Sequence, residues 1–177
     1  MINANIAKRY ASALIRIAQN KNIVGKTGEE LLLALKVYLT SSLPRIILNP
    51  LISEQEKKSL LERMFTDKLS PNTMEFLKTL IIKKRFDLLP DITEIYGLLS
   101  DEAQNIIRVK VTSAFPLSAS EENTLLAKLN IITRKKIVLK SELNKSLLGG
   151  MLIQLGDTVL DGSVKGRLRY MKEHMFN

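Results

Sequence analysis

Apolar residues recur at every third or fourth position through most of residues 1–105, and this spacing predicts a succession of amphipathic helices. The first helix is expected from about Asn5 to Gln19, and the second is expected to follow Gly28. The apolar positions of the first helix are Ile6, Tyr10, Ala13, Leu14 and Ile17. Those assigned to one face of the second are Leu31, Leu32, Leu35, Tyr38 and Leu39. We therefore expect each helix to turn one apolar face toward a shared core.

Start signals locate further helices. Ser53 and Glu56 have the spacing of a capping box, in which the hydroxyl and the carboxylate each accept a hydrogen bond from a backbone N–H. Pro71 follows Ser70 at a first helical position, where the missing proline N–H is not needed. A short segment at "PRIIL" and a last helix ending near Leu99 bring the pattern to six helical segments. The expected structure of residues 1–105 is therefore a six-helix bundle.

The periodicity changes at about residue 106. In "IIRVKVTSA" the apolar residues Ile107, Val109 and Val111 alternate with polar ones, as in a half-buried strand. A second capping box, Ser118 with Glu121, opens a helix, and "KKIVLKSEL" is again strand-like. The expected fold class is α+β overall, with the helical bundle followed by a small α/β domain over residues 106–177. The elements of that domain are expected in the order strand–helix–strand–hairpin–helix.

Five of the eight glycines fall within one short stretch, residues 149–170. Gly149–Gly150 would permit a sharp entry into the strand "MLIQL", and Gly156–Asp157 suits a type II′ hairpin. Asp161–Gly162 is expected to turn the chain into a terminal helix capped by Ser163. Gly166 lies inside that helix, and we expect another backbone to approach it there. The apolar stripe of the terminal helix is Val164, Leu168, Met171 and Met175.

The chain is basic, with a formal net charge of +9, and the charge is uneven. Residues 106–177 carry 12 Lys and Arg against 6 Asp and Glu, whereas residues 1–105 carry 15 against 12. Such a surplus suits an acidic partner, which could be nucleic acid, anionic lipid or an acidic protein surface. No acidic residue precedes Glu29, a composition shared with mitochondrial transit peptides. The continuous helical spacing instead favours a basic first helix of the fold itself.

Candidate chemistry is sparse. The chain has no cysteine, which excludes disulfides and thiolate metal sites, and His174 has no metal-binding or catalytic partner beside it. "GKT" at residues 25–27 resembles the end of a phosphate-binding loop, but Asn20 stands where that loop requires glycine. "DGSVKGRL" has the cations of an anion-binding helix start, yet Asp161 opposes an anion, so a structural turn is favoured. No residue is assigned to catalysis, a cofactor or a metal ion.

The stretch "IVLKSELNKSLLGGMLIQLGDTVLDGSVKGRL" closely resembles the C-terminal signature of the delta subunit family of F-type ATP synthases. The mitochondrial relative in that family is the oligomycin-sensitivity-conferring protein. The resembling positions include Gly149–Gly150, the Gly156–Asp157 turn, and Asp161–Gly162–Ser163 before the terminal helix. "IAKRYASALIRIA" is similar to the family's first helix, and "RFDLLPDI" to the junction between its fifth and sixth helices. The resemblance spans essentially the whole chain.

This resemblance implies a non-catalytic stator subunit. In the family, the N-terminal bundle sits on the catalytic head, built of alpha and beta subunits, and grips N-terminal segments of the alpha subunits. The C-terminal domain holds the b or b′ subunits of the peripheral stalk, so that rotor torque drives ATP synthesis. The resemblance also implies contact with the membrane only through the complex, at the cytoplasmic face of a bacterial membrane or in an organelle counterpart, and no nucleic-acid partner.

The resemblance further suggests which residues meet these partners. The family's head-binding groove lies between the first and fifth helices. In this sequence those helices present Tyr10, Ala11 and Leu14 opposite Phe76, Leu77 and Leu80. The candidate stalk contacts on the terminal helix are Val164, Leu168 and Met171. The alternative for several groove residues is that they belong to the core of the bundle.

Two other classes of protein stay open at this point. A basic RNA- or ribosome-associated protein would fit the net charge and the basic runs at residues 83–85 and 134–136. Its strands, however, lack the aromatic residues that usually interleave with cations on an RNA-binding sheet. A nucleotide-handling enzyme rests only on the incomplete "GKT" match.

Overall fold

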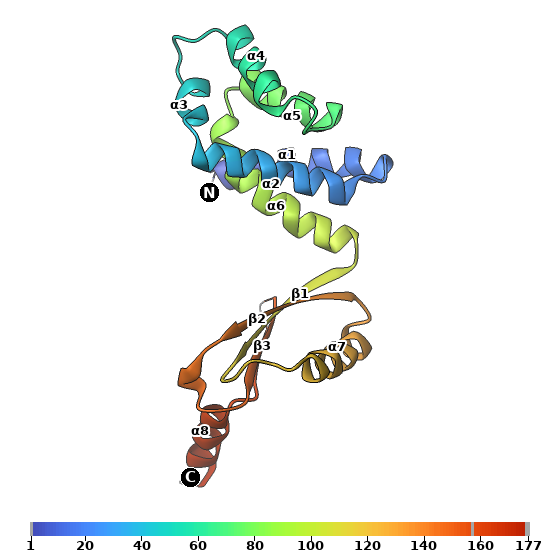
Figure 1. Cartoon of the computed structure of the whole chain (residues 1–177), viewed down its shortest axis with the longest axis vertical. Helices are drawn as coiled ribbons and strands as arrows, with labels where there is room; N and C mark the ends of the chain where they lie inside the picture. The colour runs from blue at the N-terminus through green and yellow to red at the C-terminus, as the bar shows by residue number, and fades with distance from the viewer. Residues whose placement is uncertain (1, 157, 176–177) are drawn as a thin grey trace. The chain divides into compact units, whose positions relative to one another are not determined.

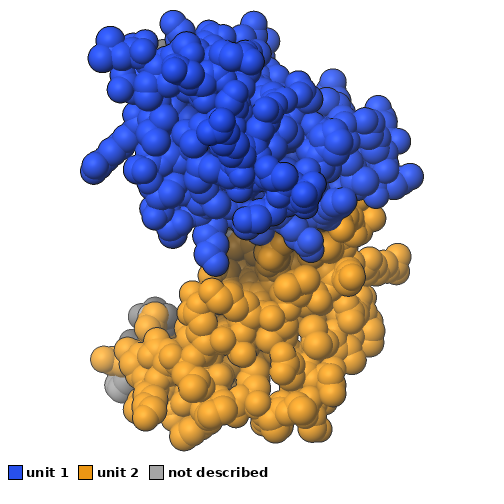
Figure 2. Space-filling view, turned by 45° about the horizontal axis from the view of Figure 1, so that its top comes forward, with its two compact units in different colours: residues 1–100 blue, residues 101–177 orange. Residues whose placement is uncertain are grey.

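The chain folds into two compact units, residues 1–100 and residues 101–177, coloured blue and orange in Figure 2. The computed structural model describes residues 2–156 and 158–175. The first unit is helical, and the second combines helices with a four-stranded sheet (Figure 1). The expected α+β class is therefore confirmed.

The helical unit follows the predicted start signals. Its elements are α1 (Ile2–Asn20), α2 (Val24–Thr40), α3 (Leu43–Ile47), α4 (Glu54–Phe65), α5 (Pro71–Ile82), the 3-10 turn η1 (Phe86–Leu88) and α6 (Leu89–Ala103), whose last residues belong to the second unit. The capping box at the start of α4 is confirmed, because Ser53 Oγ accepts from the Glu56 amide and a Glu56 carboxylate oxygen accepts from the Ser53 amide. Pro71 is the first residue of α5, as predicted.

The start of α2 differs from the prediction. The helix begins at Val24 rather than after Gly28, so both Gly25 and Gly28 lie inside it. Gly28 lies against a neighbouring ring: a Cβ placed there would be 3.5 Å from Cε1 of Tyr96 on α6. That distance is an ordinary van der Waals contact, so Gly28 is an interior residue of α2 with room for a methyl group, and it neither ends nor precedes a helix.

The apolar face of α2 also differs from the prediction. Leu31 and Ala34 are buried, whereas Leu32 and Leu39 are 59% and 69% exposed. Consecutive residues of a helix point about 100° apart, so Leu31 and Leu32 cannot both lie at the centre of one inward face. The assignment of Leu32 and Leu39 to the core face was therefore wrong.

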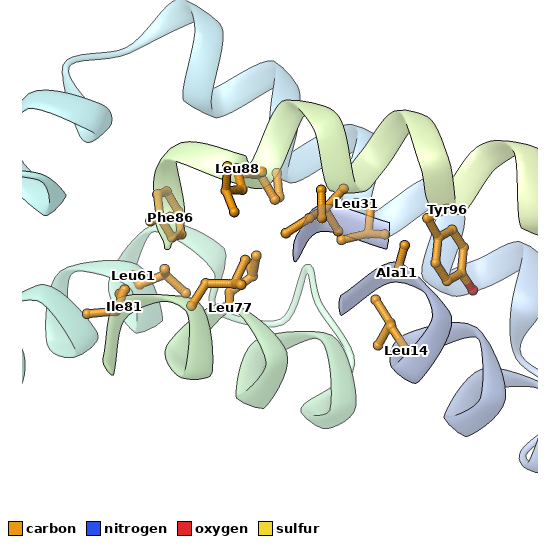
Figure 3. Close-up of a cluster of buried hydrophobic side chains, with 14 of the residues drawn as sticks. Ala11, Leu14, Leu31, Leu61, Leu77, Ile81, Phe86, Leu88 and Tyr96 are labelled. Atoms are coloured by element: carbon orange, nitrogen blue, oxygen red, sulfur yellow. The ribbon is translucent and has the colours of Figure 1, made fainter. Parts of the chain in front are cut away.

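One cluster of buried side chains stabilises the helical unit (Figure 3). Leu31 of α2, Leu77 of α5 and Leu88 of η1 belong to it, and the Tyr96 hydroxyl donates to the carbonyl oxygen of Val24 over 3.0 Å. The inward face of α1 is Ala7, Ala11, Leu14, Ile15 and Ala18. The three alanines on this face allow the backbone of α1 to lie close to its neighbours. The basic N-terminal segment is thus a core helix of the fold.

The second unit contains the predicted sequence of strands and helices. Its elements are β1 (Ile106–Ser113), α7 (Ala119–Thr133), β2 (Lys136–Leu143), the 3-10 turn η2 (Lys145–Leu147), β3 (Met151–Leu155), β4 (Thr158–Asp161) and α8 (Val164–Met175). The capping box of Ser118 with Glu121 at the start of α7 is confirmed. The order strand–helix–strand–hairpin–helix is therefore confirmed, and β1 begins at the predicted change of periodicity.

The sheet of the second unit is mixed. Its strand order is β2-β1-β3-β4, with β1 and β2 parallel and the other neighbours antiparallel. Val109 on the central strand pairs with Leu139 of β2 and with Leu155 of β3. Val109 and Val111 form a small core with Leu129 of α7. Because α7 links the two parallel strands, it covers the apolar face of the sheet on that side.

Candidate partner-binding surfaces

An aromatic pair joins α1 and α5, the two helices of the predicted groove. The rings of Tyr10 on α1 and Phe76 on α5 meet edge to face, with centroids 6.4 Å apart and planes at 72°. Near the other end of α1, Lys21 Nζ donates to Asn72 Oδ1 over 2.7 Å. Both predicted aromatic groove residues are partly exposed, so a partner could contact them.

The other four predicted groove residues lie deeper. Ala11, Leu14, Leu77 and Leu80 are each at most 2% exposed and belong to the core of the unit. Figure 3 shows the first three of them among the buried side chains. Ala11 therefore brings together helices of this chain, and an approaching partner would not reach it. The structure thus separates the predicted set into a surface pair, Tyr10 and Phe76, and a supporting layer beneath.

Two adjoining hollows extend the surface along α1. The first is lined by Ile6, Arg9, Tyr10, Ala13 and Arg85. The second is lined by Asn5, Lys8, Arg9, Ser12, Ala13 and Arg16. The hollows share Arg9 and Ala13, so they form one surface with apolar parts and a cationic rim. The sequence analysis assigns none of Arg9, Arg16 and Arg85 to a site. For Arg9 and Arg16, the absence of acidic residues before Glu29 could have indicated a cationic surface.

A buried carboxylate fixes the start of α5. Glu30 on α2 is 5% exposed, and its Oε1 accepts from the Ser70 amide over 2.9 Å while its Oε2 accepts from Ser70 Oγ over 2.7 Å. Thr73 Oγ1 also donates to Glu30 Oε2. These bonds join residues 40 or more positions apart, and they place a negative charge at the positive end of the helix dipole. Sequence spacing gave no signal for this contact.

The three residues of α8 that were predicted to contact the stalk are exposed. Val164, Leu168 and Met171 are 45%, 58% and 53% exposed, and Tyr170 beside them is 63% exposed. Several exposed apolar side chains along one helix are typical of a protein-binding surface. Figure 1 shows α8 as the last element of the chain, next to the C-terminus.

The turn into α8 is built from side-chain caps. Ser163 is the predicted cap, and its Oγ accepts from the Gly166 amide over 2.9 Å. Asp161 Oδ1 accepts from the Ser163 amide over 2.9 Å, and the Ser163 donors lower the pKa of the Asp161 carboxyl. The helix start thus already holds a negative group of the chain's own, as the structural-turn interpretation requires.

The group that leaves no room for a side chain at Gly166 is not the one predicted. A Cβ at Gly166 would lie 2.5 Å from Oδ2 of Asp161, so the neighbour is the capping carboxylate and not another backbone. The prediction of a close backbone approach was therefore wrong for this residue. A side chain at position 166 would displace the Asp161 cap.

A close backbone approach does occur at Gly150. Its φ is +76°, and a Cβ there would lie 2.4 Å from the carbonyl oxygen of Gly162. The neighbouring Gly149 carbonyl accepts from the Val164 amide over 3.0 Å, and the Met151 carbonyl accepts from the Gly162 amide over 3.0 Å. The motif glycines therefore anchor the start of α8 against the entry to β3.

The hairpin glycine behaves as a turn residue. Gly156 has a φ of +56° and joins β3 to β4, while Asp157 lies outside the described residues. No atom would lie within 4 Å of a Cβ at Gly156. This glycine is needed for its backbone conformation alone.

The described residues form neither the phosphate-binding loop suggested by "GKT" nor a metal-binding cluster. Residues 25–27 are helical in α2, and no strand precedes them in the described chain, so a phosphate-binding loop is not formed there. Within residues 2–156 and 158–175, His, Asp and Glu form no cluster suited to a metal ion. In the same residues, no helix combines the length and hydropathy needed to cross a bilayer.

Comparison with known proteins gives one consistent family. The sequence profile described as "ATP synthase delta (OSCP) subunit" matches residues 6–175. The ATP synthase subunit delta of Desulfitobacterium hafniense is 35% identical over 99% of this chain and 98% of its own length. That of Chlorobium phaeobacteroides is 39% identical over 94% of this chain and 93% of its own length.

A solved structure agrees with the sequence relatives. A chain in the cryo-EM structure of the Toxoplasma gondii mitochondrial ATP synthase hexamer matches with a TM-score of 0.62 and 27% identity, over 97% of both chains. The comparisons give the RNA-binding alternative no support. The family is non-catalytic and is part of the peripheral stalk of the proton-driven synthase. The chain belongs to the ATP synthase delta (OSCP) subunit family.

Proposed function

We propose that this chain is the stator subunit that links the catalytic head of an F-type ATP synthase to the b or b′ subunits of its peripheral stalk. The family match over residues 6–175 carries this proposal. A stator must hold two partners at once, and the chain offers two compact units with a separate candidate surface on each. In a bacterial cell the complex would place the chain at the cytoplasmic face of the membrane.

The first unit is proposed to bind the head. In this proposal it acts as a six-helix bundle, and an amphipathic N-terminal helix of an alpha subunit lies across α1 and α5. Tyr10 and Phe76 meet the partner directly, because their rings are partly exposed and already in contact with each other. Ala11, Leu14, Leu77 and Leu80 contribute by holding α1 and α5 in place, since they are buried.

The second unit is proposed to bind the stalk. Val164, Leu168 and Met171 of α8 would meet the b or b′ helices, because a helix with a half-exposed apolar stripe pairs well with another amphipathic helix. The glycines at positions 149, 150 and 162 and the capping residues Asp161 and Ser163 set the direction in which α8 leaves the sheet. Their role is thus to position the binding helix.

Alanine substitution of the aromatic pair tests the head interface. Tyr10→Ala and Phe76→Ala, separately and together, should weaken binding of the full chain to the purified head from the same organism. Buried aromatic contacts at interface centres are worth about 2 kcal/mol or more, which is about 30-fold in affinity. The measurement is a binding titration at equal protein concentration, with far-UV circular dichroism reporting the fold of each variant.

A matched leucine controls for loss of apolar surface. Leu39 lies on α2, is 69% exposed and is outside the proposed groove, so Leu39→Ala should leave head affinity unchanged. If the aromatic variants keep their helical content and bind as tightly as the original chain, the assignment of Tyr10 and Phe76 is wrong.

A further inference from the structure

The positive charge of the helical unit is concentrated in its first 28 residues. Residues 1–28 contain five Lys and Arg and no Asp or Glu, whereas residues 29–100 contain ten Lys and Arg against ten Asp and Glu. The unit thus carries a formal charge of +5 over its first segment and of zero over the rest. Such segregation creates a local field that the net charge of the unit does not reveal.

The residues that the structure describes leave the cations of α1 without an ion pair. Lys8, Arg9 and Arg16 are exposed, and no carboxylate among the described residues forms an ion pair with them or with Arg85. Other cations are paired. Lys78 contacts Glu62 and Glu75, Arg108 contacts Asp101, and Lys110 contacts Glu142.

The free cations stand beside the proposed groove. Arg9 lines both hollows on α1, and Arg85 lines the hollow that contains Tyr10. Arg9 and Arg16 are seven residues apart, which is about two turns or 10.5 Å along the helix axis. Ser12 and Ala13 lie between them and have short side chains, so a partner backbone can approach closely at that point.

We propose that the outward face of α1 is an electrostatic docking surface for an acidic amphipathic helix of the catalytic head, with Arg9, Arg16 and Arg85 drawing that helix toward the Tyr10–Phe76 pair. The inference rests on the proposed function and adds the chemistry of the partner. The partner helix carries carboxylates about two turns apart on the edge that faces α1. Its apolar side chains enter the hollow formed by Ile6, Tyr10 and Ala13.

A protein helix suits this surface better than nucleic acid does. Phosphate groups would interact with the arginines but would gain nothing from the apolar parts of the hollow, Ile6, Tyr10 and Ala13. An amphipathic helix satisfies both at once, since one edge supplies carboxylates and the adjoining face supplies apolar side chains. The charges and the aromatic pair then have different kinetic roles. Rim charges govern the association rate, and the apolar contact governs the dissociation rate.

Charge reversal separates these roles. The full-length Arg9→Glu/Arg16→Glu variant is compared with Lys36→Glu/Lys68→Glu, which reverses two exposed cations outside residues 1–28 with the same change in net charge. Association and dissociation rates with the purified head are measured between low and high salt. The arginine reversal should lower the association rate at least about 10-fold at low salt, remove most of its salt dependence and leave the dissociation rate within about twofold. The lysine control should change the association rate much less.

A conservative variant separates charge from shape. Arg9→Lys/Arg16→Lys keeps both charges but loses the planar fork of the guanidinium, so steering predicts an association rate close to that of the original chain. Equal association rates for the arginine and lysine reversals would overturn the inference, as would an effect confined to dissociation. Competition by a 20-base-pair RNA duplex at physiological salt would replace it with a nucleic-acid surface. If the original chain fails to bind the head at all, the proposed function fails together with the inference, whereas failure of the charge prediction alone leaves the proposed function standing.

Discussion

Gly150 and Gly156 provide a direct test of why the C-terminal glycines are needed. Both have positive φ, +76° and +56°, but only Gly150 is crowded. A Cβ at Gly150 would lie 2.4 Å from the Gly162 carbonyl oxygen and 2.9 Å from Ser163 Cα, whereas nothing would lie within 4 Å of a Cβ at Gly156. The two alanine substitutions therefore share a conformational cost and differ in steric overlap.

The expected magnitudes follow from these contacts. A left-handed alanine costs about 1–2 kcal/mol, offset by about 0.4–1 kcal/mol because alanine restricts the unfolded chain. Gly156→Ala should therefore destabilise the second unit by roughly 1 kcal/mol. At Gly150 the overlap must also disturb the Gly162–Met151 and Val164–Gly149 backbone hydrogen bonds, each 3.0 Å long and worth about 1 kcal/mol. Gly150→Ala should therefore cost about 3 kcal/mol.

Hydrogen exchange resolves the effect in the full chain. Amide exchange followed by mass spectrometry reports residues 101–177 separately from the helical unit, which serves as the internal control. The difference of about 2 kcal/mol should appear as roughly 30-fold faster exchange in β3 and the start of α8 for Gly150→Ala than for Gly156→Ala. Equal protection in the two variants would refute the close-approach explanation of Gly150.

Three further predictions concern other parts of the chain. Glu30→Ala leaves the Ser70 and Thr73 donors without their acceptor and should lower the free energy of unfolding in urea by about 2–4 kcal/mol. Glu29→Ala on the exposed side should lower it much less. Equal losses would contradict a stabilising role for the hydrogen bonds to Glu30. Hydrogen bonds from Ser118 lower the pKa of Glu121 in the folded chain. The stability that this cap contributes is therefore fully present above the ordinary glutamate pKa of about 4.3, and it is lost as the pH falls through the lower pKa of the folded state. Exchange in α7 should therefore lose less protection on acidification in Ser118→Ala than in the original chain, and an identical acid response would count against this cap. Leu168→Asp should weaken binding to the soluble part of the b subunit without changing head affinity, and unchanged stalk binding would remove α8 from that interface.

Much of the secondary structure could be predicted because its causes are local. The capping boxes at Ser53 and Ser118 and the proline start at Pro71 each involve residues within one helical turn, and all three are present. The alternation of Ile107, Val109 and Val111 likewise fixes which side of β1 is buried. Such signals need no knowledge of the rest of the chain.

The errors arose where tertiary contacts decide the outcome. The inward face of α1 uses Ala7 and Ala18, while Ile17 is 46% exposed, because close helix packing selects small side chains over larger apolar ones. The sequence predicts a helix boundary at Gly28, whereas this residue lies inside α2 and contacts the Tyr96 ring of α6. Apolar periodicity alone cannot detect either effect.

The candidate site was predictable only in part for the same reason. Family resemblance suggested α1 and α5, but sequence spacing could not separate the exposed pair Tyr10 and Phe76 from buried residues such as Leu77 and Leu80. A substitution at Leu80, which is 0% exposed, would test the core and not the partner surface. The hydrogen bonds from Ser70 and Thr73 to Glu30 could not be predicted from the sequence, since these donors lie 40 and 43 residues away from Glu30.

Reconstitution from purified parts tests directly whether one chain bridges the head and the stalk. Purified catalytic head and the soluble part of the b subunit are mixed with or without the full-length chain and separated by size exclusion at moderate salt. We expect the head and the b subunit to co-elute only when the chain is present, with one copy of the chain per head. Co-elution without the chain, or binding of only one partner by a folded chain, would contradict the bridging role.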